Sequence, residues 1–243
     1  MIDHEMIFLA GHHRSGTSLL HEIIREHPEI TGFENTGVPE DEGQHLQCVL
    51  KPAKAYGGPG KYIFNRNARM TEHHCLATEE SAHAIMSQWK KYYGPDNKYY
   101  VEKSPPNLIR TRFLQKIFPN SRFIVILRHP IAVALATQKW SRTSIKSLLE
   151  HTLLGYETFA HDRAWLDKSY VLRYENFVVG PQKTVDDIFR FLQLPSRRIE
   201  HRVNSSVNDK YYVMWESARR SLKKSCIADG KREFGKEGQS LWV

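Results

Sequence analysis

Cysteine is scarce in this sequence, and its few cysteines lie far apart. The 243 residues include three, Cys48, Cys75 and Cys226, and no Cys-x-x-Cys pair. An odd number at wide spacing argues against a disulfide framework and against a zinc ribbon. We therefore expect a protein that works in a reducing compartment, the cytoplasm.

Long hydrophobic runs are also missing. No segment approaches the ~18 apolar residues of a membrane-spanning helix. The N-terminal stretch MIDHEMIFLAGHH is too acidic, and too short in its apolar part, for a signal peptide. We expect no membrane partner. Because 40% of the residues are hydrophobic, the sequence can build a sizeable core, and we expect a single domain over residues 1–243.

Positive charge is in excess, with a formal net charge of +8 at pH 7. Such an excess favours anionic partners, although scattered basic residues are usually a solvated surface. RNA-binding motifs such as an RNP1 run are absent, so we expect no nucleic-acid partner. A non-catalytic protein that binds anions or nucleic acid is therefore the least favoured alternative.

The most informative segment lies near the N-terminus. Residues Met6–Ala10 form an apolar run typical of a buried strand, and Leu19–Ile24 carries apolar residues at helical spacing. Between them lies the glycine loop 11–18, with the sequence GHHRSGTS. A strand, a tight glycine loop and a helix direct several backbone N–H groups at one point, which suits a phosphate-like anion.

The loop nearly matches the P-loop pattern GxxxxGK[ST]. Gly11 and Gly16 have the required spacing, and Ser18 occupies the Ser/Thr position, but Thr17 stands where the lysine should be. The cation in the loop is Arg14 instead. The missing lysine argues against an ATPase. A P-loop kinase that uses ATP and Mg²⁺ on a small molecule is therefore the runner-up interpretation, ahead of the non-catalytic binder.

Arg-Ser-Gly-Thr-Ser after a strand, followed by His27-Pro28, resembles the 5′-phosphosulfate loop of one family. These are the sulfotransferases that use 3′-phosphoadenosine 5′-phosphosulfate (PAPS), in the branch with bacterial and tyrosylprotein sulfotransferases. The resemblance implies a P-loop-like α/β fold, PAPS as cofactor, the bisphosphate PAP as product, and no metal. It implies that the cofactor is bound by Arg14, Ser15, Gly16, Thr17 and Ser18, with Arg14 also catalytic.

A second block, FPNSRFIVILRHPIAVALA, resembles another hallmark of that family. Its apolar strand is followed at once by Arg128, which the resemblance assigns to the cofactor's 3′-phosphate. A planar guanidinium suits bidentate phosphate contacts. Eight residues later the family has a serine, but this chain has Ala136. Thr137 is the candidate substitute, although on a helix it would point about 100° away.

The resemblance also implies a carboxylate that accepts the acceptor's proton. Glu34 matches its place best, and Glu42 and His45 are held in reserve. Lys103 follows the strand-like Tyr99–Val101 and matches the family lysine that points at the transferred group. In the C-terminal part, Lys210 is expected to contact phosphate.

The remaining segments alternate between strand and helix patterns. Further strands are expected at 30–35 and 169–174, further helices at 71–93, 108–118 and 143–160, and a substrate-facing loop at 51–69. This alternation predicts an α/β fold with a central parallel sheet flanked by helices. The acceptor, whether a small molecule, a carbohydrate or a peptide, and the oligomeric state are left open.

Overall fold

The computed structural model describes residues 5–94 and 97–228 of the chain. The chain divides into two compact units, residues 1–205 and 206–243. The first contains the sheet, and the described part of the second contains helix α8 (Asp209–Ala228). The single domain over 1–243 stays a prediction.

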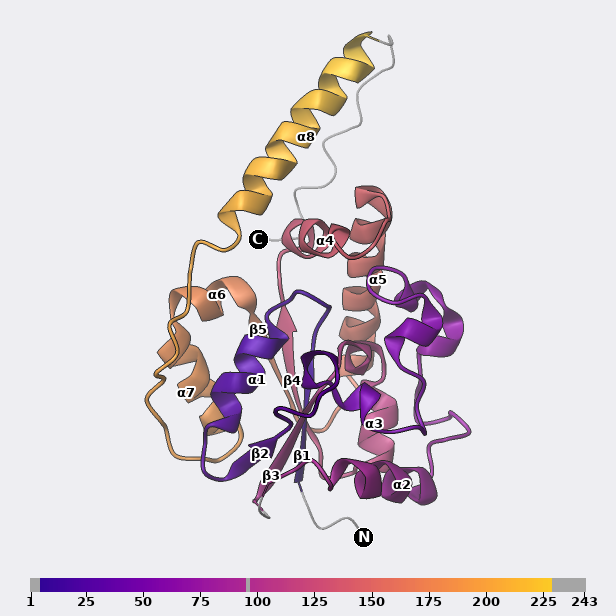
Figure 1. Cartoon of the computed structure of the whole chain (residues 1–243), viewed down its shortest axis with the longest axis vertical. Helices are drawn as coiled ribbons and strands as arrows, with labels where there is room; N and C mark the ends of the chain where they lie inside the picture. The colour runs from indigo at the N-terminus through magenta and orange to yellow at the C-terminus, as the bar shows by residue number, and fades with distance from the viewer. Residues whose placement is uncertain (1–4, 95–96, 229–243) are drawn as a thin grey trace. The chain divides into compact units, whose positions relative to one another are not determined.

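The first unit is built on one five-stranded parallel sheet, in the order β2-β3-β1-β4-β5 (Figure 1). The strands are β1 (Glu5–Ala10), β2 (Ile30–Gly32), β3 (Tyr99–Lys103), β4 (Arg122–Leu127) and β5 (Ser169–Arg173). Residues 6–10 of β1 are fully buried, because helices cover both faces of the sheet. A strand buried on both faces has an uninterrupted apolar sequence, as predicted.

Two apolar clusters hold the helices against the two faces. The helices of this unit are α1 (Thr17–Arg25), α2 (Glu79–Trp89), α3 (Thr111–Ile117), α4 (Pro130–Gln138), α5 (Ile145–Arg163), α6 (Tyr174–Val179) and α7 (Pro181–Phe191). On one face, α2, α3 and α5 pack against Phe8 and Phe123. On the other, α1, α6 and α7 pack against Ile7 and Ile124 (Figure 1). The predicted fold class is confirmed.

Two segments differ in detail from the sequence patterns. The helix expected over 71–93 begins only at Glu79, because the Thr78 side chain accepts a hydrogen bond from the Ser81 N–H and caps it there. The 51–69 loop contains three short 3₁₀ helices, η3 (Ala53–Tyr56), η4 (Tyr62–Phe64) and η5 (Arg66–Ala68). Other 3₁₀ helices are η1 (Pro39–Asp41), η2 (Gly43–His45) and η6 (Pro105–Ile109).

The topology fixes where a ligand would bind. From β1 the chain proceeds to β2 and β3 on one side and then to β4 and β5 on the other, so the order reverses at β1. In open α/β sheets, ligands bind at the carboxyl ends of the strands at such a reversal. The glycine loop follows β1 at this point.

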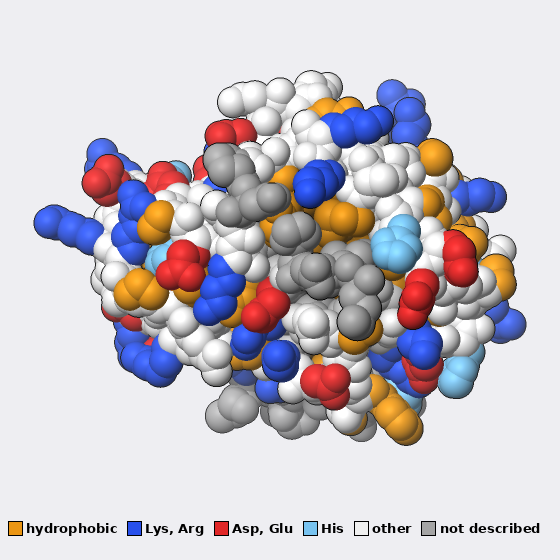
Figure 2. Space-filling view, turned by 90° about the horizontal axis from the view of Figure 1, so that it is seen from below, with side chains coloured by type: hydrophobic (Ala, Val, Ile, Leu, Met, Phe, Trp, Pro, Cys, Tyr) orange, Lys and Arg blue, Asp and Glu red, His pale blue; other side chains and the backbone are white. Residues whose placement is uncertain are grey.

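The surface below the sheet carries charge of both signs. Figure 2 views the face at the lower end of Figure 1, where Lys and Arg side chains are interspersed with Asp and Glu. On this face the positive excess is not gathered into one continuous basic area. Among the described helices, none is both long and apolar enough to span a bilayer.

Candidate active site

The glycine loop is a tight, internally bonded turn. The N–H and the hydroxyl of Ser15 both donate to the His12 carbonyl, at 3.1 and 2.7 Å. Gly16 has φ 98°, and a Cβ there would lie 2.5 Å from the Tyr174 ring. Only glycine fits this position, and α1 begins directly after it at Thr17. The first N–H groups of α1 have no partner within the helix and are therefore suited to an anion.

Two arginines meet at this loop. Arg14 adopts φ 66°, its side chain is exposed, and its guanidinium carbon lies 4.7 Å from the centre of the Trp140 ring. The buried Arg128 donates from Nη1 to the Arg14 carbonyl at 2.6 Å and lies over the Tyr174 ring at 4.3 Å. Arg128 therefore stabilises the loop backbone through this hydrogen bond. Its contact with a 3′-phosphate stays a prediction.

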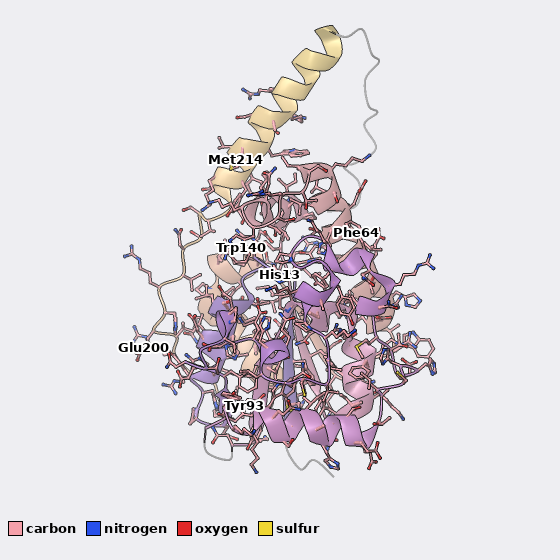
Figure 3. All side chains as sticks on the ribbon, turned by 45° about the vertical axis from the view of Figure 1, so that its right-hand side comes forward. His13, Phe64, Tyr93, Trp140, Glu200 and Met214 are labelled. Atoms are coloured by element: carbon pink, nitrogen blue, oxygen red, sulfur yellow. The ribbon has the colours of Figure 1, made fainter. Side chains whose placement is uncertain are left out.

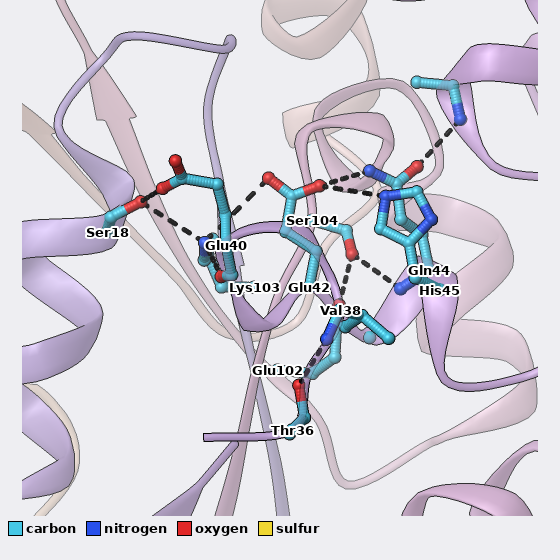
Figure 4. Close-up of polar contacts among 12 residues, drawn as sticks. Ser18, Thr36, Val38, Glu40, Glu42, Gln44, His45, Glu102, Lys103 and Ser104 are labelled. Atoms are coloured by element: carbon cyan, nitrogen blue, oxygen red, sulfur yellow. Dashed lines mark hydrogen bonds and ion pairs between the residues drawn. The ribbon is translucent and has the colours of Figure 1, made fainter. Parts of the chain in front are cut away.

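Lys103 reaches the loop from the neighbouring strand. Its partner in the β1–β3 register is Leu9, so it ends β3 beside the start of the loop. The side chain is 1% exposed. Its ammonium group contacts the Ser18 hydroxyl at 3.3 Å and donates to the Glu40 carbonyl (Figure 4). These contacts bring Lys103 to the glycine loop, and its catalytic role toward the transferred group stays a prediction.

A carboxylate already lies on the loop. The Ser18 hydroxyl donates to Glu40 Oε2 at 2.9 Å. Glu40 and Asp41 both adopt a positive φ, 55° and 49°, which is uncommon outside glycine. The Asp41 carboxylate accepts hydrogen bonds from the Asn35 and Thr36 N–H groups, and these contacts hold the bend. Ser18 thus binds an anionic side chain of the chain itself, and Lys103 binds the carbonyl oxygen of the same residue.

Glu42 is a buried carboxylate close to Lys103. Its Oε1 lies 3.9 Å from the Lys103 ammonium group, and the residue is 7% exposed. Burial raises the pKa of Glu42 from 4.5 to about 7, an effect that Lys103 and the Gln44 amide oppose and that Glu102 and Glu40 reinforce. A carboxylate with a pKa near neutrality is suited to accept a proton.

The other two candidates for the base differ from Glu42. Glu34 has a side chain that is 59% exposed and forms an ion pair with Arg25 of α1. Among the described contacts, none joins it to the loop or to Lys103, so its assignment as base stays a prediction without support from proximity. His45 lies 3.9 Å from Glu42, and its pKa is lowered by burial and by the lysines Lys54 and Lys103.

Thr137 and Lys210 were expected to contact the cofactor. Thr137 and its neighbour Ala136 are both buried in α4, and Thr137 lines a small pocket with His13 and His151. Lys210 belongs to the second unit, where its ammonium group lies 5.1 Å from the Tyr211 ring centre. Both roles stay predictions.

Sequence reasoning gave no role to a cluster of histidines beside the loop. His12 and His151 pack with their ring centres 5.3 Å apart, and His13 meets Tyr62 edge-on at 5.7 Å. Burial lowers the pKa of His12 to about 4, of His13 to about 3 and of His151 to about 2, so all three are neutral at pH 7. The sequence shows two histidines in the glycine loop, but it does not show that residues of α5 face them. The cluster could therefore not be predicted.

Two exposed aromatic side chains occupy the same end of the structure as His13. Figure 3 shows Trp140 and Phe64 toward this end, whereas Tyr93 lies toward the other. Trp140 is 53% exposed and Phe64 46%. Within the described residues, no group of three His, Cys, Asp or Glu side chains is placed to hold a metal ion.

Comparison with known proteins identifies the family. The model of the sulfotransferase family matches residues 6–198, which include the loop, Lys103 and Arg128. The chain belongs to the sulfotransferase family. It is 23% identical over 212 residues to protein-tyrosine sulfotransferase 1 of Danio rerio, covering 79% of this chain and 54% of the relative.

Other sulfotransferases resemble it to a similar degree. Omega-hydroxy-beta-dihydromenaquinone-9 sulfotransferase Stf3 of Mycobacterium bovis is 24% identical over 244 residues, covering 77% of this chain and 62% of the relative. The chain therefore spans little more than half the length of these curated relatives.

Solved structures of sulfotransferases share the fold. The sulfotransferase domain of the Synechococcus PCC 7002 olefin synthase superposes with a TM-score of 0.54 at 18% identity, covering 86% of this chain and 89% of that one. A sulfotransferase from Alicyclobacillus acidocaldarius gives 0.53 at 15% identity, covering 89% and 93%.

Proposed function

We propose that this sulfotransferase-family chain transfers a sulfuryl group from PAPS to an acceptor hydroxyl or amine. The observation that carries the proposal is that the buried Lys103 contacts both Ser18 of the anion loop and Glu42, a carboxylate of raised pKa. The loop fits an anionic donor, because Ser18 and Lys103 already bind the side chain and the carbonyl of Glu40.

The loop would hold the phosphosulfate end of the donor. The backbone N–H groups at the start of α1 and the hydroxyls of Thr17 and Ser18 are the binding groups. Arg14 and Lys103 carry the positive charge that stabilises the bridging oxygen as the bond between it and sulfur breaks. PAPS supplies the sulfuryl group. Positioning and electrostatics then contribute most of the rate enhancement, as in phosphoryl transfer.

Glu42 is the base in this proposal, in preference to Glu34. Its carboxylate takes the proton from the acceptor hydroxyl while the acceptor oxygen forms its new bond to sulfur, and PAP leaves. Glu42 is buried beside Lys103, whereas Glu34 is exposed and paired with Arg25. Arg128, Thr137 and Lys210 are assigned to the cofactor as proposals.

The named relatives bear on the acceptor class. The two named relatives are a protein-tyrosine sulfotransferase and an omega-hydroxy menaquinone sulfotransferase. Tyrosine and an omega-hydroxy compound both present a hydroxyl group, so a hydroxyl acceptor is the first choice here. The cytoplasmic location stays a prediction.

A thermal-shift titration tests the cofactor. PAP should raise the melting temperature, since a ligand that binds only the folded state stabilises it by about 2.7 kcal/mol at a hundredfold excess over Kd. AMP should have little effect, because it lacks the 3′-phosphate. A shift with ATP and Mg²⁺ but none with PAP would replace this proposal with the kinase alternative.

A further inference from the structure

Glu102 is a fully buried carboxylate that the proposed mechanism does not use. It precedes Lys103 on β3, so the two side chains point to opposite faces of the strand. Glu102 is 1% exposed and accepts hydrogen bonds from the Ser104 hydroxyl, from Asn107 Nδ2 at 2.6 Å and from the Gly43 N–H. Burial raises the pKa of Glu102, and the hydrogen bonds from Ser104, Asn107 and Gly43 oppose that rise.

These donors connect Glu102 to the segment that carries Glu42. Gly43 lies so close that a Cβ there would be 2.5 Å from Glu102 Cγ. The Ser104 hydroxyl, which donates to Glu102, accepts from the Gln44 N–H at 3.0 Å. The two residues after Glu42 are thus fixed to β3 through one carboxylate.

Gln44 completes the connection to the base. Its side-chain amide donates to Glu42 Oε2, and its carbonyl oxygen accepts from the Ala53 N–H at 2.7 Å (Figure 4). Both the nitrogen and the oxygen of the Gln44 side-chain amide are therefore hydrogen-bonded, one to Glu42 and the other to Ala53. The backbone of Gln44 is held by Ser104, which is in turn bonded to Glu102.

We propose that Glu102 is a positioning residue, which fixes the Glu42 carboxylate against Lys103 through the hydrogen bonds that hold Gly43 and Gln44. The inference rests on the proposed function, in which Glu42 accepts the acceptor's proton. The titratable groups that face Glu42 are Lys103 and Glu102 from β3, Glu40 from η1, His45 from η2 and Tyr62 from η4. Of these, Glu102 and Glu40 raise the pKa of Glu42, and only Glu102 is buried among its own donors.

The variant Glu102→Gln nearly preserves the shape and removes one acceptor oxygen. The new amide can donate to the Ser104 hydroxyl, but it has one oxygen for the Asn107 and Gly43 donors, where the carboxyl group has two. We expect kcat to fall with the KM for PAPS unchanged, because the segment that carries Glu42 is displaced while the glycine loop is intact. Carbon-13 NMR of the glutamate carboxyls, with E42Q to assign the signal, should show a displaced Glu42 resonance without requiring turnover.

The variant Ser104→Ala breaks the second connection. It removes the hydroxyl that accepts a hydrogen bond from the Gln44 N–H and leaves Glu102 in place. We expect kcat to fall by up to roughly 100-fold, the effect of a misplaced catalytic group, with the KM for PAPS unchanged. The matched control is Glu5→Gln, at the far end of β1, which should change neither quantity.

Three outcomes would overturn the proposal. One is a kcat and a Glu42 carboxyl resonance in E102Q that match the wild type. The second is wild-type kcat in S104A, which decides the positional link if E102Q does not fold. The third is an equal loss of kcat in E5Q. If the wild-type chain binds PAP but transfers no sulfuryl group, or does not bind PAP, the proposed function fails, and the NMR comparison still decides whether Glu102 controls Glu42.

Discussion

Replacing Glu42 with glutamine should have two opposite effects, on stability and on activity. The pKa of Glu42 is raised from 4.5 to about 7 in the folded chain, chiefly by burial. One pKa unit corresponds to about 1.4 kcal/mol, so the ionised carboxylate destabilises the folded state by roughly 3 kcal/mol. Glutamine carries no charge and removes that destabilisation.

The direction of the shift sets the pH window. Below 4.5 the carboxyl is protonated in both the folded and the unfolded chain, and the shift has no effect. From 4.5 to about 7 the folded chain retains a proton that the unfolded chain has lost, so wild-type stability falls as pH rises. E42Q should therefore match the wild type near the bottom of this window and melt higher above it, by about 2–4 °C per kcal/mol.

Activity should change in the opposite direction. Without the base, kcat should fall by roughly 10²- to 10⁴-fold, while PAP still raises the melting temperature. Melting curves across the window and initial rates of sulfuryl transfer measure the two effects. Glu34→Gln is the matched control, because its exposed carboxylate should affect neither. A stability difference that is independent of pH, or wild-type turnover in E42Q, would refute the reasoning.

Three further variants test the loop. Arg14→Ala should lower kcat by roughly 10²- to 10³-fold with an unchanged melting temperature, because its side chain is exposed; near-normal turnover would remove Arg14 from catalysis. Arg128→Ala should weaken binding of PAP more than of AMP, and should also lower the melting temperature because the Arg14 carbonyl loses its donor; equal losses for both nucleotides in titration calorimetry would place the 3′-phosphate elsewhere. Gly16→Ala should destabilise the fold by about 1–3 kcal/mol in denaturant unfolding, since its Cβ would meet the Tyr174 ring; an unchanged midpoint would contradict the loop geometry.

Local sequence patterns were sufficient to predict the parallel sheet and the glycine loop. The run Met6–Ala10 and the glycines after it lie within one short segment, and the fold preserves their order as strand, turn and helix. Lys103 could be placed because it ends a strand, and the ends of neighbouring parallel strands meet at one edge. Both inferences depend on neighbours in sequence or on the regular geometry of a sheet.

The choice of base depended on contacts that no short pattern contains. Glu34 pairs with Arg25, and Glu42 is buried against β3. The left-handed conformations of Glu40 and Asp41 turn the acidic segment toward the loop, and neither residue type predicts them. The histidine cluster likewise exists only where α5 packs beside the loop.

The packing of Tyr174 on Gly16 has a consequence for synthesis on the ribosome. The loop and α1 emerge early. The ring that covers Gly16, and over which the Arg128 guanidinium lies, belongs to Tyr174, which comes much later in the chain. A nascent chain that ends before β5 has the glycine sequence without the side chain that packs on it. Because domains generally fold as units during translation, we expect nucleotide-binding competence to arise only after the segment through Tyr174 has left the exit tunnel.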